Sequence, residues 1–119
     1  MVPKKILILE DDEATAELMK FYMHEEGFQV AVSSMGSSFI NKAAEFQPDL
    51  ITLDVLLPDA DGFSVFKNLQ QDERTRNIPV IFVTVREDKE KGLKMGARGY
   101  IMKPFKEGEL KNTIKSIVG

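Results

Sequence analysis

The chain has 119 residues, of which 43% are hydrophobic and 29% are charged, and its formal net charge is −3 at pH 7. A chain of this length can fold as one domain around a real core, and we expect a single domain over residues 1–119. The mildly acidic balance argues against direct nucleic-acid binding. The chain contains no cysteine, which excludes disulfides and thiolate metal sites and is typical of a cytoplasmic protein. No apolar run approaches the ~20 residues of a membrane span, so we expect no membrane contact.

Five short apolar runs predict β-strands. They are Ile6–Leu9, Phe28–Val32, Leu50–Leu53, Pro79–Thr84 and Gly99–Met102. The third and fourth runs are continuously apolar, which is typical of strands that are buried on both faces of a parallel sheet. The second run alternates between apolar and polar residues, which predicts a strand at the edge of the sheet.

Apolar residues at helical spacing follow each of these strands. The predicted helices run from Ala14 to just before Gly27, over Phe39–Phe46, from Phe63 to about Gln71, through Leu93 and Met95 up to Gly96, and over Phe105–Val118. Strands that alternate with helices indicate an α/β fold, with right-handed crossovers and helices on both faces of a parallel sheet.

Polar residues stand where four of the predicted strands end. Glu10 and Asp11 follow the first strand, Asp54 follows the third, Thr84 ends the fourth, and Lys103 follows the fifth. In a doubly wound sheet the carboxyl ends of the first and third strands are neighbours. The three carboxylates would therefore repel one another without compensation, and Mg²⁺ is the cation that suits carboxylates, waters and a phosphoryl oxygen.

Each of these residues also has a simpler interpretation. Asp12 or Glu13 could merely cap the next helix, a threonine at a strand end often bonds backbone, and a lysine before proline usually lies in solvent. Their joint placement at one edge is harder to explain in this way. A nucleophile, a metal site, a cation and a hydroxyl donor together meet the needs of phosphoryl transfer.

Four segments carry a resemblance to a known family: ILILEDDE, LITLDVLLPDADG, IPVIFVT and GARGYIMKPF. In this order they resemble the receiver domains of two-component response regulators, of the type found in chemotaxis regulators, over essentially the whole chain. The resemblance implies a flavodoxin-like fold, in which a five-stranded parallel sheet of order 2-1-3-4-5 is flanked by five helices.

The resemblance also implies roles for the residues at the strand ends. Asp54 matches the phosphoacceptor, which takes a phosphoryl group from a histidine kinase. Glu10 and Asp11 match the acidic pair that holds Mg²⁺ together with Asp54 and the backbone carbonyl of Leu56. Asp11 would be a direct ligand, and Glu10 would act mostly through water.

Three further positions match the parts of the family that respond to phosphorylation. Thr84 matches a switch hydroxyl that moves toward the phosphoryl group, and Lys103 matches a lysine that pairs with a phosphoryl oxygen. Tyr100 matches an aromatic switch that turns inward as Thr84 moves. In the family, the bond between Lys103 and Pro104 is commonly cis.

The partners that the resemblance implies are a histidine kinase or phosphotransfer protein and a downstream output domain or protein. The output partner would bind the surface of the fourth helix, fifth strand and fifth helix, and such a protein would be a signalling switch rather than a turnover enzyme. The interval from Thr84 to Tyr100 is shorter than usual by about three residues, close to one helical turn. We therefore expect a shortened or partly unwound fourth helix.

Three other functions are less consistent with the sequence. An inactive receiver that serves only as a protein-interaction module would share the fold, but here every expected site residue is present. A phosphatase with an aspartyl nucleophile needs a second carboxylate two residues beyond Asp54, where this chain has Leu56. A nucleotide-binding enzyme is disfavoured because no glycine-rich phosphate loop follows the first strand.

Overall fold

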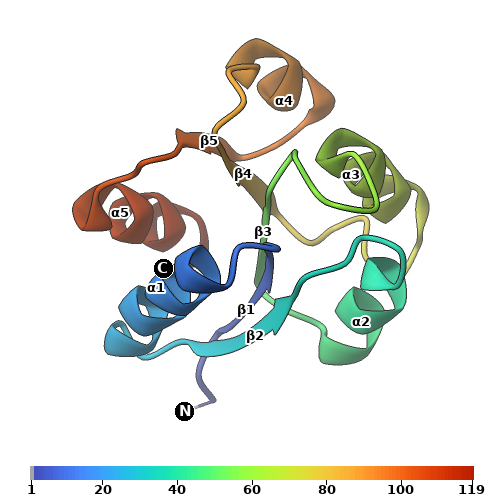
Figure 1. The fold of residues 1–119 in the computed structure, drawn as a ribbon. Coiled ribbons are helices and arrows are strands. Elements are labelled where there is room, and N and C mark those ends of the chain that lie inside the picture. Colours follow the sequence, from blue (N-terminus) through green and yellow to red (C-terminus); the bar gives the residue numbers. More distant parts are fainter. Residues whose placement is uncertain (1) are drawn as a thin grey trace.

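A computed structural model describes residues 2–119 and shows one parallel five-stranded sheet between two layers of helices (Figure 1). The strands are β1 (Lys5–Leu9), β2 (Gln29–Ser33), β3 (Leu50–Leu53), β4 (Val80–Thr84) and β5 (Gly99–Met102). Their order across the sheet is β2-β1-β3-β4-β5, and every neighbouring pair is parallel. The predicted fold class is confirmed, and so is the position of the second strand at an edge.

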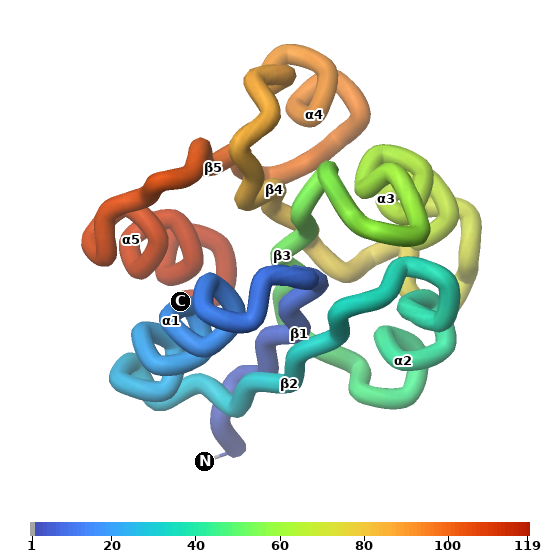
Figure 2. The backbone as a smooth tube through the Cα atoms, in the orientation of Figure 1, coloured from blue at the N-terminus to red at the C-terminus, as the bar shows by residue number. Residues whose placement is uncertain are grey.

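In residues 2–119, four helices connect successive strands and a fifth follows β5. They are α1 (Glu13–Glu25), α2 (Phe39–Phe46), α3 (Gly62–Gln71), α4 (Lys89–Met95) and α5 (Glu107–Val118). Helices α1 and α5 cover one face of the sheet, and α2, α3 and α4 cover the other (Figure 1). Figure 2 traces this alternation along the backbone, with the acidic loop after β1 close to the centre of the sheet.

The period-two alternation of the strands divides the core into two halves. In β1, Ile6 and Ile8 face α1 and α5, whereas Leu7 and Leu9 face α2 and α3. All four side chains are buried because β1 is an interior strand with a helical layer on each face. This explains why interior strands read as continuous apolar runs in the sequence.

The last helix begins later than predicted. It starts at Glu107, not at Phe105, because the backbone at Lys106 is extended, with φ −91° and ψ 147°. The bond between Lys103 and Pro104 is cis, as the resemblance implies. Phe105 instead packs against the core beneath α1 and α5. Its apolar character reports burial in a loop, which the periodicity could not distinguish from the first turn of a helix.

The fourth helix is short, as predicted: α4 has seven residues and ends at Gly96, where φ is +113°. It lies very close to the sheet: a Cβ atom added at Gly92 would be only 2.7 Å from the ring of Tyr100, so this approach requires glycine. Gln70 of α3 donates a hydrogen bond from Nε2 to the carbonyl of Met95 at 2.6 Å. The shortened helix is thus held from both the sheet and α3.

One buried hydroxyl lacks a partner within residues 2–119. Thr52 Oγ1 neither donates nor accepts a hydrogen bond, although Thr52 is only 1% exposed. The cost of burying an unpaired hydroxyl is about 1 to 3 kcal/mol. We therefore expect Thr52→Val, which keeps the shape of the side chain, to raise the free energy of unfolding by about 1 kcal/mol. Urea unfolding measures this, and a loss of stability would show that the hydroxyl bonds a buried water.

Within the same residues, no helix combines the length and the apolar character needed to cross a lipid bilayer.

Candidate functional site

Three carboxylates meet at the carboxyl ends of β1 and β3. These strands are neighbours in the sheet, with Leu9 opposite Leu53, so the residues that follow them are brought together. Each of Glu10, Asp11 and Asp54 offers a carboxylate oxygen, and these oxygens lie within 4.8 Å of one another. Glu10 is 3% exposed and Asp54 is 5% exposed, whereas Asp11 is open to solvent. A group of hard oxygen donors at this spacing fits a Mg²⁺ ion.

A single ammonium group bridges the two buried carboxylates. Lys103 Nζ lies 2.5 Å from Glu10 Oε1 and 2.8 Å from Asp54 Oδ2. Its side chain is 14% exposed, so the bridge is largely removed from water. Buried charges in such a cluster are tolerated only when they are paired, and Lys103 supplies this pairing for Glu10 and Asp54.

The electrostatics of the pair depend on burial. Burial raises the pKa of Glu10 above its usual value of 4.5, although Lys103 opposes this shift. Burial alone would lower the pKa of Lys103, but the hydrogen bonds with Asp54 and Glu10 outweigh burial and raise it. Because the pKa of Glu10 is raised on folding, this residue lowers stability as pH rises from 4.5 through its folded pKa. Mg²⁺ binding to the cluster should weaken in the opposite direction, as pH falls through the same range, because protons then compete with the ion for Glu10.

The loop after β3 is folded back onto Asp54. The amide of Leu56 donates to Asp54 Oδ1 at 3.1 Å, and Leu56 pairs with Asp61 across the loop. The amide of Gly62 donates to the carbonyl of Val55 at 2.8 Å. The backbone around Asp54 is therefore fixed from both sides, and the side chain of Leu56 is left 49% exposed.

Thr84 and Tyr100 are joined through one residue that sequence reasoning missed in this role. Thr84 is fully buried, and its Oγ1 accepts a hydrogen bond from the amide of Arg86 at 3.2 Å. The hydroxyl of Tyr100 donates to the carbonyl of the same Arg86 at 2.5 Å. The Tyr100 ring is 8% exposed and packs on Phe82, with the ring centroids 5.6 Å apart. Both predicted switch residues thus bind the backbone of Arg86, and burial raises the pKa of the Tyr100 hydroxyl.

The side chain of Arg86 is also engaged. Its guanidinium lies 5.8 Å from the centroid of the Phe63 ring and 3.6 Å from a carboxylate oxygen of Asp88. Lys91 of α4 lies over the same ring at 4.4 Å. Two cations therefore stack on one aromatic ring at the start of α3, which ties the loop after β4 and the short α4 to that helix.

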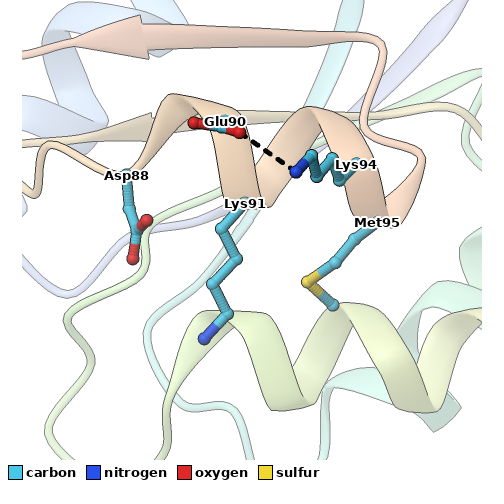
Figure 3. Close-up of a pocket in the computed structure, with 5 residues that line it drawn as sticks. All are labelled: Asp88, Glu90, Lys91, Lys94 and Met95. Atoms are coloured by element: carbon cyan, nitrogen blue, oxygen red, sulfur yellow. Dashed lines mark ion pairs between the residues drawn. The ribbon is translucent and has the colours of Figure 1, made fainter.

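Two hollows open on the surface of the described residues, one at α4 and one next to Lys103. One, of about 430 Å³, is lined by α4 and the residue before it, and Figure 3 shows Lys91 and Met95 pointing toward α3 while Glu90 and Lys94 pair with each other. The other, of about 260 Å³, lies between α1 and the segment after β5. Its lining residues are Thr15, Leu18, Lys103, Pro104 and Phe105. Lys103, which bridges Glu10 and Asp54, also lines the second hollow.

Comparison with known families assigns this arrangement. Residues 6–115 match the sequence model of the response regulator receiver domain. The chain belongs to this family. The resemblance inferred from the four sequence segments is therefore confirmed: the chain is a response regulator receiver domain, which is a component of two-component systems.

The chain is also similar to individual regulators. It is 38% identical to the phosphate regulon transcriptional regulatory protein PhoB of Escherichia coli over 118 residues, which cover 97% of this chain and 52% of PhoB. It is 36% identical to the alkaline phosphatase synthesis transcriptional regulatory protein PhoP of Bacillus subtilis, covering 97% of this chain and 48% of PhoP. The chain thus spans about half the length of the curated relatives it matches.

Solved structures agree with the fold. The receiver domain of the sensor histidine kinase PA1611 from Pseudomonas aeruginosa superposes with a TM-score of 0.89 at 27% identity, covering 99% of both chains, and it has a magnesium ion coordinated in its active-site cleft. The BeF3-activated receiver domain of Klebsiella pneumoniae RstA superposes with a TM-score of 0.88 at 26% identity, covering 97% of this chain and 98% of that domain.

The structure brings together most of the residues that the sequence singled out. Glu10, Asp11, Asp54 and Lys103 form one cluster, and Leu56 adjoins it through its amide. Thr84 is buried at the end of β4, and among the described residues its hydroxyl bonds Arg86 rather than Asp54. Tyr100 lies farther along the same chain of contacts. The roles of these residues remain predictions.

Proposed function

We propose that this receiver domain accepts a phosphoryl group on Asp54 from the phosphohistidine of a histidine kinase or phosphotransfer protein. The observation that carries the proposal is the cluster itself. The buried carboxylate of Asp54 lies 2.8 Å from the ammonium group of Lys103. One oxygen of Asp54 also lies within 4.8 Å of carboxylate oxygens of Glu10 and Asp11. This arrangement supplies a nucleophile, a cation and a metal-binding group at one point.

In the proposed transfer, an oxygen of Asp54 attacks the phosphorus atom, and a bond between them forms as the bond from phosphorus to the donor nitrogen breaks. The electron pair of the broken bond returns to the imidazole, which takes up a proton. Glu10, Asp11, Asp54 and the carbonyl of Leu56 would hold Mg²⁺. When bound, this ion neutralises charge on the phosphoryl oxygens. Lys103 would leave its bridge with Glu10 and pair with a phosphoryl oxygen.

The response to phosphorylation is proposed to run through Arg86. The phosphoryl group adds negative charge and acceptor oxygens beside the strand ends. If the hydroxyl of Thr84 turns to donate to one of these oxygens, its hydrogen bond with the Arg86 amide changes. The carbonyl of Arg86 holds Tyr100. A movement of Thr84 would therefore shift Tyr100 and change the surface formed by α4, β5 and α5. An output domain or protein would bind this surface.

The direct test is the mass of the intact protein after incubation with Mg²⁺ and a small phosphodonor. The wild-type protein should gain about 80 Da, the mass of one phosphoryl group. Asp54→Asn keeps the shape of the side chain but removes the nucleophile, so it should show no adduct. Because an aspartyl phosphate is an acyl phosphate, hydroxylamine should attack its carbonyl carbon, release phosphate and leave a hydroxamate on Asp54.

The same experiment separates the main alternative. A receiver that acts only as a protein-interaction module would fold normally and give no adduct in the wild-type protein.

The expectation that the chain is a switch rather than a turnover enzyme remains a prediction, as does its cytoplasmic location. The expected lack of direct nucleic-acid binding also remains a prediction, since relatives include the DNA-binding response regulator MtrA of Mycolicibacterium smegmatis, of which the chain spans 47%.

A further inference from the structure

An acid outside the metal-binding group ties together two loops at the same edge of the sheet. Asp59 lies in the loop after β3, five residues beyond Asp54 in the chain. Its Oδ1 accepts a hydrogen bond from the amide of Gly36 at 2.9 Å, and its Oδ2 accepts one from the amide of Ser37 at 2.8 Å. Both donors belong to the loop between β2 and α2. Figure 2 shows the two loops, in green and teal, side by side.

The two backbone amides that bind Asp59 are not part of a helix or strand. Gly36 and Ser37 lie just before Ser38, the N-cap residue of α2, so their amides are outside the hydrogen bonding of the helix and need an acceptor elsewhere. Ser38 occupies the N-cap position of α2 but makes no hydrogen bond from its side chain. Asp59 supplies that acceptor from another loop and so holds the turn that leads into α2. The pKa of Asp59 is lowered, first by the hydrogen bond from Gly36, as expected for a carboxylate that accepts from backbone amides.

The two loops are also in close contact beside these hydrogen bonds. A Cβ atom at Gly36 would lie 2.8 Å from the Cβ of Ala60 and 3.1 Å from a methyl carbon of Val65. Only glycine lets the backbone approach this closely, so the hydrogen bonds to Asp59 form beside a packed apolar contact. The outer end of the loop after β3 is fixed to its neighbour by polar and apolar contacts together.

The other end of this loop forms part of the acidic cluster. Asp54 Oδ1 accepts from the amide of Leu56, and Leu56 pairs with Asp61 on the far side of Asp59. The residues between these anchors are few, so a shift at Asp59 must be absorbed close to Leu56. The tie at Asp59 therefore constrains the backbone that contacts the nucleophile and would provide the carbonyl ligand.

We propose that Asp59 is a positioning residue, which holds the loop after β3 in the geometry that Mg²⁺ binding and phosphorylation of Asp54 require; this rests on the function proposed above. Asp59 does not touch the reacting atoms. It acts through Leu56, whose amide and carbonyl it places by fixing the loop to Gly36 and Ser37.

Calorimetric titration with Mg²⁺ tests this proposal without a phosphodonor. Asp59→Ala should weaken Mg²⁺ binding by about tenfold, the lower end of the effect for residues that orient metal ligands. Asp59→Asn keeps one oxygen that can accept a hydrogen bond, so its affinity should fall between those of the wild-type protein and Asp59→Ala. The amides of Gly36 and Ser37 should exchange hydrogen faster in Asp59→Ala than in the wild-type protein.

A matched control separates positioning from stability. Asp72, in the loop after α3, likewise accepts a backbone hydrogen bond, from Arg74 at 2.8 Å, and pairs with its guanidinium. Asp72→Ala should lower the unfolding temperature and leave Mg²⁺ affinity unchanged. If Asp59→Ala also lowers only the unfolding temperature, or if the wild-type protein binds no Mg²⁺, the proposal is wrong. If Mg²⁺ binding behaves as expected but no adduct forms on Asp54, the positioning role holds and the proposed function fails.

Discussion

Replacing Lys103 with methionine should destabilise the protein by about 3 to 5 kcal/mol at neutral pH in the absence of divalent cations. Glu10 and Asp54 are almost fully buried and share the Lys103 ammonium as their cation. Methionine fills a similar volume, so the change removes the charge and keeps most of the packing. Two carboxylates would then face each other in a low-dielectric site without compensation. Urea unfolding with 1 mM EDTA measures the loss.

The dependence on pH and metal identifies the cause. Lys103 lowers the pKa of Glu10, so its removal raises that pKa further above 4.5. The folded mutant takes up a proton more readily than the unfolded chain, and the stability lost should return as pH falls through the raised pKa. Mg²⁺ should stabilise the mutant more than the wild-type protein, because the ion supplies the missing charge. Lys67→Met, at an exposed position on α3, should change stability by less than about 0.5 kcal/mol. A Lys103→Met protein that matches the wild type at every pH would contradict this reading of the cluster.

Much of the fold could be predicted because strong local signals bound its elements. The ranges Leu50–Leu53 and Gly99–Met102 agree with the structure residue for residue. The first follows Pro48, and the second follows Gly96, whose positive φ ends α4. Between such breaks an apolar run has few alternatives to a buried strand. The strand ends then place Glu10, Asp11 and Asp54 together, since β1 and β3 are neighbours in any sheet of this order.

The contacts between the loops around the site could not be predicted from the sequence. The bond from Gly36 to Asp59 joins residues 23 positions apart in two loops that have no periodicity. The link between Thr84 and Tyr100 uses the backbone of Arg86, and a backbone atom leaves no mark on residue type. The short interval after Thr84 predicts a shortened α4, but it does not show that Gly92 lets this helix rest on the Tyr100 ring. Such contacts are properties of how loops pack, and they follow only from the assembled fold.

Gly62→Ala should destabilise the protein by about 3 kcal/mol, at the upper end of the usual cost of overpacking. An added Cβ would lie 2.1 Å from the carbonyl oxygen of Asp54 and 2.7 Å from Cα of Val55. Both atoms belong to backbone, so no side-chain rotation can relieve the clash. The start of α3 or the end of β3 must move, and either movement displaces Asp54. Chemical unfolding measures the first effect, and the rate of adduct formation should fall by about 100-fold, as expected for a misplacement near 1 Å.

Gly108→Ala is the matched control. Gly108 also lies in the first turn of a helix, but nothing stands within 4 Å of an added Cβ there. Alanine should stabilise this helix by about 0.5 to 1 kcal/mol, through helix propensity and a less flexible unfolded chain. Propensity alone predicts a gain at both positions, because both glycines are helical. Opposite signs would therefore show that Gly62 is required by the close approach of α3 to the backbone of Asp54. A gain at Gly62, or phosphorylation at the wild-type rate, would mean that this approach does not constrain the nucleophile.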